Sequence, residues 1–198
     1  MTEIARSTPE ETSSSLNSLQ RWAKTLQWWP SLAGAVAAGV FAFDLAQGRD
    51  LAPVVTASAL IYLGAAALQK KSSAWPLFFA SLLLGGLGSF LFDLNAAWVL
   101  IILGGPLLAY GVVKGGFIRP MSGLPLQTIG MLTFSAAALV ALAVEPKVGA
   151  LLVAVALFTH AAWDVYHHRV DRVVSRSLSE FCFVLDTALG IIILVTIA

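Results

Sequence analysis

The feature that most constrains the fold of this chain is a series of apolar stretches that follow one another from Ser31 to the C-terminus. Each is about 20 residues long, which is the length a helix needs to cross the hydrocarbon core of a bilayer. Lipid offers no hydrogen-bond partners to backbone amides, so such stretches must be helical, and the alternating pattern of a barrel strand is missing. The sequence therefore predicts an all-α, polytopic membrane helix bundle.

Seven transmembrane helices fit the chain. They are predicted at residues 31–47, 51–69, 75–93, 96–113, 125–144, 147–166 and 179–197. The composition agrees, because 58% of the 198 residues are hydrophobic and only 12% are charged, against about a quarter in soluble domains. Residues 31–198 are thus expected to form one seven-helix domain in the lipid bilayer, as a multi-pass protein of a plasma or cytoplasmic membrane.

Residues 1–30 have a different character. They begin as a polar tail, rich in Ser, Thr and Glu, which lacks the basic start and apolar core of a signal peptide. Between Ser15 and Trp29, apolar side chains recur at spacings of three and four, with Arg21 and Lys24 among them. This pattern predicts an amphipathic helix that lies in the membrane interface.

The basic residues predict the orientation of the bundle, because they gather in alternate loops. One set of loops holds Arg6, Arg21, Lys24, Lys70, Lys71, Lys114, Arg119, Arg169, Arg172 and Arg176, and the other set holds Arg49 and Lys147. Cytoplasmic loops carry the excess of Lys and Arg, so the N-terminus is expected in the cytoplasm and the C-terminus outside. The net charge of +1 gives no basis for binding nucleic acid.

Ionisable residues inside the last two predicted helices mark a candidate site. His160, Asp164 and His168 recur every four residues and share one helical face, while Asp186 follows Cys182 by four residues. In an antiparallel hairpin, His160 is level with Asp186 and Asp164 with Cys182. The level of His160 and Asp186 is about 10 Å inside the membrane. We predict that His160, Asp164 and Asp186 perform acid–base chemistry, or that these three residues and His168 bind a metal.

Three uses of this site stay open. Histidine and carboxylates suit a divalent metal ion such as zinc or iron as a cofactor. A desolvated histidine–carboxylate pair also suits proton relay, and the same pair can simply lock two helices together. Three functions correspond to these uses. We favour a small carrier or permease-like protein that handles protons, a metal ion or a small anion. The alternatives are a membrane-embedded acid–base or metal-dependent enzyme acting on a lipid-soluble substrate, and a non-catalytic subunit or assembly factor.

The loop before the last helix predicts two further features. Arg169, Arg172 and Arg176 are expected to contact anionic lipid headgroups, and the last two can clamp a phosphate or carboxylate if the loop is helical. Ser177 and Glu180 have the spacing of a capping box, which predicts that Glu180 caps the last helix.

Small residues predict close helix contacts. Ala35 and Gly39 in the first helix, and Gly85, Gly86 and Gly88 in the third, leave room for a neighbouring backbone. Such surfaces also allow an oligomer or a complex partner. The sequence contains none of the motifs that mark zinc proteases, serine hydrolases or phosphate-binding loops.

Overall fold

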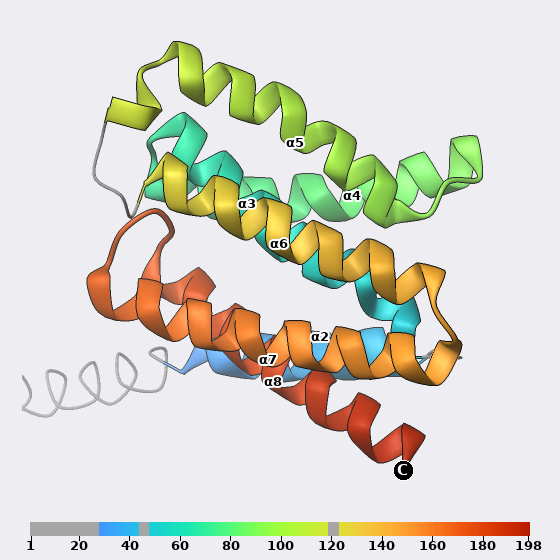
Figure 1. Ribbon diagram of the computed structural model, residues 1–198. Coiled ribbons are helices and arrows are strands. Elements are labelled where there is room, and N and C mark those ends of the chain that lie inside the picture. The colour runs from blue at the N-terminus through green and yellow to red at the C-terminus, as the bar shows by residue number, and fades with distance from the viewer. Residues whose placement is uncertain (1–27, 44–47, 119–122) are drawn as a thin grey trace, which may run out of the picture.

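The computed structural model describes residues 28–43, 48–118 and 123–198, and within these ranges the chain is helical with no strand (Figure 1). The all-α prediction is confirmed. The α-helices are α2 (Trp29–Phe43), α3 (Ala52–Leu68), α4 (Ala74–Phe92), α5 (Ala96–Val113), α6 (Leu124–Ala143), α7 (Pro146–Val170) and α8 (Arg176–Ile197). Three short 3-10 turns join them: η1 (Gly48–Leu51), η2 (Lys71–Ser73) and η3 (Gly116–Ile118).

Six helical segments are long and apolar enough to cross a membrane, which indicates a multi-pass membrane protein. They are Gly48–Leu68, Lys71–Phe92, Ala96–Val113, Leu124–Ala143, Pro146–Val170 and Arg176–Ile197. The seventh apolar helix, α2, has 15 residues and measures about 22 Å at 1.5 Å per residue. The predicted interfacial helix begins at Ser15 and falls almost entirely outside the described residues.

The predicted helix boundaries hold to within two residues for α3 to α6, and they fail where α7 meets α8. Helix α7 continues to Val170 and α8 begins at Arg176, so both are longer than predicted. Apolar composition predicts where a helix leaves the lipid, and a helix can continue into water with polar residues in its last turn. Helix α7 ends where Asp171 adopts the left-handed conformation, with φ at 49°.

The prediction that Ser177 and Glu180 form the cap of α8 is wrong. Ser175 is the N-cap, and its side chain accepts a hydrogen bond from the Leu178 amide. Glu180 instead accepts a hydrogen bond from the Ser31 hydroxyl of α2. The loop 171–175 is not helical, and therefore Arg172 and Arg176 do not stand one helical turn apart on a common face.

Helix α3 lies at the centre of the bundle. It packs against α4, α5 and α6, while α7 packs against α6 and α8, and α2 lies along α8 (Figure 1). Five of its fully buried residues are alanines, which lets the neighbouring backbones approach closely. They are Ala52, Ala59, Ala65, Ala66 and Ala67.

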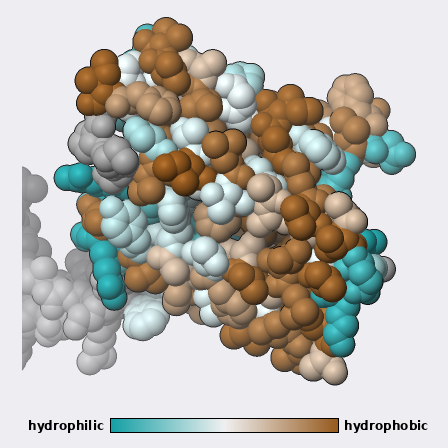
Figure 2. All heavy atoms as spheres, in the orientation of Figure 1, coloured by the Kyte–Doolittle hydropathy of each residue, from teal (hydrophilic) through white to brown (hydrophobic). Residues whose placement is uncertain are grey.

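Charged residues gather at the two ends of the bundle, and apolar side chains cover the belt between them (Figure 2). We call the basic end the one that holds Lys70, Lys71, Lys114, Arg169, Arg172 and Arg176. There Lys71 forms an ion pair with Asp171 at 3.0 Å, and this contact lowers the pKa of the Asp171 carboxyl.

The opposite end of the bundle holds Arg49 and Lys147. Arg49 donates to the carbonyl oxygen of Val144. Glu145 caps α7 by accepting hydrogen bonds from the amides of Lys147 and Val148. These amides lower the pKa of the Glu145 carboxyl.

Helix α2 does approach a neighbouring helix closely, but it does so at Gly34 and not at the predicted Gly39. A Cβ atom on Gly34 would come within 2.6 Å of the Phe181 carbonyl oxygen on α8, whereas one on Gly39 would meet nothing within 4 Å. In α4, Gly88 packs against Val99 of α5, while a Cβ on Gly86 would find open space.

Candidate functional site

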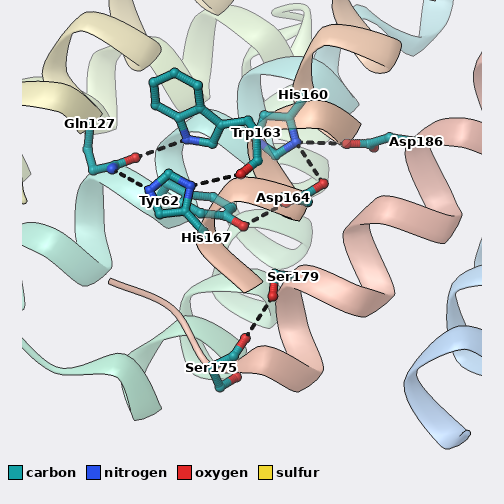
Figure 3. A network of polar contacts seen from close by, with 9 residues as sticks. All are labelled: Tyr62, Gln127, His160, Trp163, Asp164, His167, Ser175, Ser179 and Asp186. Atoms are coloured by element: carbon teal, nitrogen blue, oxygen red, sulfur yellow. Dashed lines mark hydrogen bonds and ion pairs between the residues drawn. The ribbon is translucent and has the colours of Figure 1, made fainter. Parts of the chain in front are cut away.

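The centre of the site is the His160 side chain, which lies between two carboxylates. Its Nδ1 atom is 2.8 Å from Oδ2 of Asp186 on α8 and 3.3 Å from Oδ2 of Asp164, one turn further along α7 (Figure 3). All three side chains are at most 1% exposed. The predicted pairing of His160 with Asp186 is present, and Asp164 belongs to the same cluster.

The cluster lies further from the basic ends of its two helices than predicted, because α7 and α8 extend further there. His160 is ten residues before Val170, and Asp186 is ten residues after Arg176. At 1.5 Å per residue, both lie about 15 Å from the basic ends of their helices.

Tyr62 of the central helix α3 completes the cluster. Its hydroxyl donates to Oδ1 of Asp164 at 2.6 Å, and its ring stands edge-on to His160 at 5.4 Å between centroids. Sequence reasoning missed this residue, because a tyrosine within an apolar stretch carries no charge to mark it. The available signal was a phenolic hydroxyl in the middle of a span, where a buried hydroxyl usually finds a partner.

A second polar network adjoins the cluster on its basic side. Trp163 donates its indole N–H to Oε1 of Gln127 at 3.2 Å, so the amide nitrogen of Gln127 faces Nε2 of His167 at 2.9 Å. His167 Nε2 must therefore accept this hydrogen bond, and its Nδ1 donates to the Trp163 carbonyl at 2.9 Å. The bonds define a neutral His167 with its proton on Nδ1 (Figure 3).

Tyr62 also touches this second network, since its ring lies 4.9 Å from that of His167. His167 lies one residue beyond the helix end that the sequence predicts at residue 166. The extra turn of α7 turns His167 inward, where it is buried.

Several polar atoms of the first cluster have no hydrogen-bond partner among the described residues. They are Nε2 of His160 and Oδ1 of Asp186; Oδ2 of Asp164 makes no hydrogen bond either, although it lies 3.3 Å from Nδ1 of His160 as an ion pair. Buried polar groups are satisfied in the great majority of native structures. These atoms are the ones at which the cluster can accept a further hydrogen bond or a ligand.

One ligand atom from each of His160, Asp164 and Asp186 lies within 4.8 Å of the other two. Within the described part of the chain, no other histidine, cysteine or carboxylate joins this group. His168, predicted as a fourth metal ligand, lies one turn further along α7 and is half-buried. Cys182 is buried on α8 and also stands outside the group.

A cavity of about 240 Å³ leads from Asp164 toward the basic end, between α7 and α8. His168, Arg169, Ser179 and Glu180 line it, so polar side chains continue from the cluster to the surface. Of the three predicted rim arginines, Arg169 alone lines this cavity.

A second cavity of about 240 Å³ lies between α2, α3, α4, α5 and α8, and its lining is mostly apolar. Cys182 and Leu185 line it on α8, next to the turn that carries Asp186. Ser58 and Ser81 contribute its other polar side chains. Such a lining accepts an apolar molecule or chain.

Replacing Tyr62 by Phe is expected to lower the free energy of unfolding by about 1–3 kcal/mol, because Oδ1 of Asp164 loses its donor in a buried site. Tyr166→Phe is the matched control, since Tyr166 is 45% exposed on the same bundle, and its effect should stay within about 0.5 kcal/mol. Unfolding by SDS in mixed micelles, followed by tryptophan fluorescence, measures both. Equal effects would mean that the Tyr62 hydroxyl contributes nothing through Asp164.

The fold and the site define a helical multi-pass membrane protein whose centre carries a buried, incompletely bonded cluster of one histidine and two carboxylates. No protein-family model, curated protein or solved structure matches the chain.

Proposed function

We propose that this protein binds a divalent metal ion, such as zinc or iron, through His160, Asp164 and Asp186 in the middle of the membrane, and that it acts as a small carrier of that ion. The observation that carries the proposal is the group of three buried ligand atoms within 4.8 Å of one another, together with the unpartnered atoms on the same side chains.

The charges of the cluster favour a cation. Two carboxylates share one buried site, and His160 is the only basic side chain within ion-pair distance of them in the described residues. A buried carboxylate without compensation is costly. A divalent ion balances two carboxylates while His160 stays neutral, and the three side chains then use their remaining lone pairs as ligands.

The ligand types narrow the choice of ion. One imidazole nitrogen and two carboxylate oxygens suit zinc, iron(II) or manganese, whereas copper(I) prefers sulfur ligands. In zinc and iron sites these atoms lie about 2.0–2.2 Å from the metal, which brings them within roughly 4.4 Å of one another. The three ligand atoms already lie within 4.8 Å of one another, so metal binding needs only small side-chain movements, in which the 2.8 Å hydrogen bond between His160 and Asp186 is given up.

The cavity that reaches Asp164 supports loading of the site from the basic end. Between the cluster and the opposite end of the bundle, the buried residues of α7 and α8 are all apolar. They are Gly149, Ala150, Val153, Ala154, Ala156, Leu157, Leu189, Gly190 and Ile193. A carrier with this interior must open by moving its helices, since no polar path runs through these positions.

A metal-dependent enzyme acting on a lipid-soluble substrate is the second candidate function. The mostly apolar cavity beside Cys182 and Leu185 favours it, because an apolar substrate can approach from the bilayer within one helical turn of Asp186. In that case the metal stays in place and the substrate moves.

Metal analysis of the purified protein tests the proposal. The wild-type protein is expected to retain one zinc or iron(II) ion after dialysis against that metal, and His160→Ala to lose it, since a missing ligand weakens binding at least about a hundredfold. His168→Ala is the matched control, because it removes a histidine of the same helix that stands outside the ligand group. Equal metal contents in all three proteins would overturn the proposal.

Flux measurements then separate the two functions. Proteoliposomes that contain the wild-type protein and an internal zinc-sensitive dye should show metal uptake, and those with His160→Ala should not. Stoichiometric binding without uptake would reject the carrier and leave the metal-dependent enzyme.

The orientation that goes with this function has seven spans, with α2 as the first, an N-terminus in the cytoplasm and a C-terminus outside. The ring of Trp29, at the start of α2, contacts the ring of Trp75 of α4, with the two centroids 5.3 Å apart. Gly48, after α2, packs at the opposite end, where a Cβ would lie within 2.9 Å of Ala150 and Ile193. The chain thus passes from one end of the bundle to the other between Trp29 and Gly48, and the basic end faces the cytoplasm.

Reporter fusions expressed in a bacterium test this orientation. Alkaline phosphatase, which is active only outside the cytoplasm, should be active when fused after Ala198 and inactive when fused after Val113. A green fluorescent protein at the same two positions should give the reverse pattern. Activity after Val113 would reverse the orientation, and inactivity at both positions would mean that α6, α7 and α8 do not all cross the membrane.

A further inference from the structure

A third cavity, separate from the metal cluster, lies at the basic end. It has a volume of about 260 Å³ and opens between the end of α3, the start of α6 and the loop that follows α7. Its floor consists of small or apolar residues: Ala65, Ala66, Gly116 and Leu124. Its rim carries the side chains of Gln69, Lys70, Lys71 and Arg172.

Basic side chains outnumber acidic ones around this cavity in the part of the chain that the structure describes. Lys70, Lys71 and Arg172 approach it from two different loops, and Asp171 lies beside them, paired with Lys71 at 3.0 Å. The start of α6 adds the positive end of a 20-residue helix, with Gly123 and Leu124 in the lining. An anion with several oxygens satisfies both the side chains and the helix end.

The shape of the cavity depends on specific local structure. Gly116 has no room for a side chain, since a Cβ there would lie 2.8 Å from both the Gly111 carbonyl oxygen and Leu124. Val173, which also lines the cavity, holds φ at 71°, an unfavourable conformation for a β-branched residue. Backbone of this kind is concentrated at sites that bind ligands.

The surroundings indicate where the anion comes from. Phe117 and Ile118 of η3 directly follow Gly116 and are exposed. Leu68, just before Gln69, is exposed too. Apolar side chains at this level insert into the boundary of a bilayer, which places the basic rim among the lipid headgroups.

We propose that this cavity binds the phosphate of an anionic phospholipid. The side chains of Lys70, Lys71 and Arg172 hold the phosphate next to the N-terminal end of α6. The site is independent of the metal cluster, because it shares no lining residue with the three metal ligands. Its ligand is part of the surrounding membrane and not the transported ion.

Binding of dioctanoyl phosphatidylglycerol to the full-length protein in a neutral detergent tests this site, with dioctanoyl phosphatidylcholine and inorganic phosphate as comparisons. The wild-type protein should prefer phosphatidylglycerol to phosphatidylcholine about tenfold, and the double variant Lys70→Gln, Arg172→Gln should lose this preference, since each charge-assisted hydrogen bond contributes that order of affinity. Thermophoresis of the labelled protein measures all three ligands.

The control is the single variant Lys114→Gln, compared with the single variant Lys70→Gln, because it removes a charge from the same end of the bundle but no residue that lines the cavity. It should keep the preference. Equal loss in the two single variants would overturn the site, because binding would then depend only on total charge. Binding of inorganic phosphate that is lost with Lys70 and Arg172, without any preference between the lipids, would overturn the lipid as the ligand.

Discussion

Zinc is expected to raise the free energy of unfolding of the wild-type protein by about 4 kcal/mol when the free metal is about 1,000 times its dissociation constant. The reason is that His160, Asp164 and Asp186 come together only in the folded bundle, from two helices. Asp186→Asn keeps the size of the side chain and removes one charged ligand. If affinity falls a hundredfold, the stabilisation at the same metal concentration falls to about 1.4 kcal/mol.

Reversible unfolding by SDS in mixed micelles, with and without zinc, measures this difference through tryptophan fluorescence. Asp93→Asn is the control, because Asp93 is an exposed carboxylate at the end of α4 and far from the ligand group. Its response to zinc should equal that of the wild-type protein. If zinc stabilised Asp186→Asn as much as the wild-type protein, the metal would bind elsewhere in the chain.

Replacing Gly34 by Ala is expected to lower the free energy of unfolding by about 2–3 kcal/mol. The new methyl group would stand 2.6 Å from the Phe181 carbonyl oxygen, and a backbone atom cannot turn aside as a flexible side chain does. Helix α2 must therefore move away from α8. Because Leu185 lies against the same position, the displacement also reaches the turn that carries Asp186, and metal affinity should fall together with stability.

The same helix supplies a matched control for this substitution. A Cβ on Gly39 meets nothing within 4 Å, so Gly39→Ala should be neutral or should stabilise α2 by up to about 1 kcal/mol through helix propensity. Unfolding in mixed micelles compares the two variants. Equal effects would show that α2 does not pack on α8 through Gly34.

Much of the candidate site was predictable, because its main pair depends on local geometry. The four-residue spacing of His160 and Asp164 sets one helical face, and a short connection to the next helix sets the register that pairs His160 with Asp186. His168 has the same spacing and yet stays outside the ligand group. Spacing places a residue on a face, but the distance along the helix decides whether it reaches the same level as its partner.

Tyr62, Gln127 and Gly34 mark the limit of that reasoning. Each belongs to a helix far away in the sequence, and its role depends on how that helix is rotated about its own axis. For apolar transmembrane helices the rotation leaves little trace in the sequence, since lipid and protein interior both accept apolar side chains. A tyrosine hydroxyl 102 positions from its carboxylate partner is therefore found only when the packing is known.

The sequence by itself determined the helical class, the positions of the apolar segments, the alternation of basic loops and the facing pair on the last two helices, since all of these follow from helix length, lipid solvation and a four-residue period. Tertiary structure alone decided that Tyr62 of α3 bonds to Asp164, that His167 turns inward to Gln127, and that Gly34 meets α8. These contacts depend on the rotation and depth of whole helices, which are set by many packing contacts at once and by no short stretch of the chain.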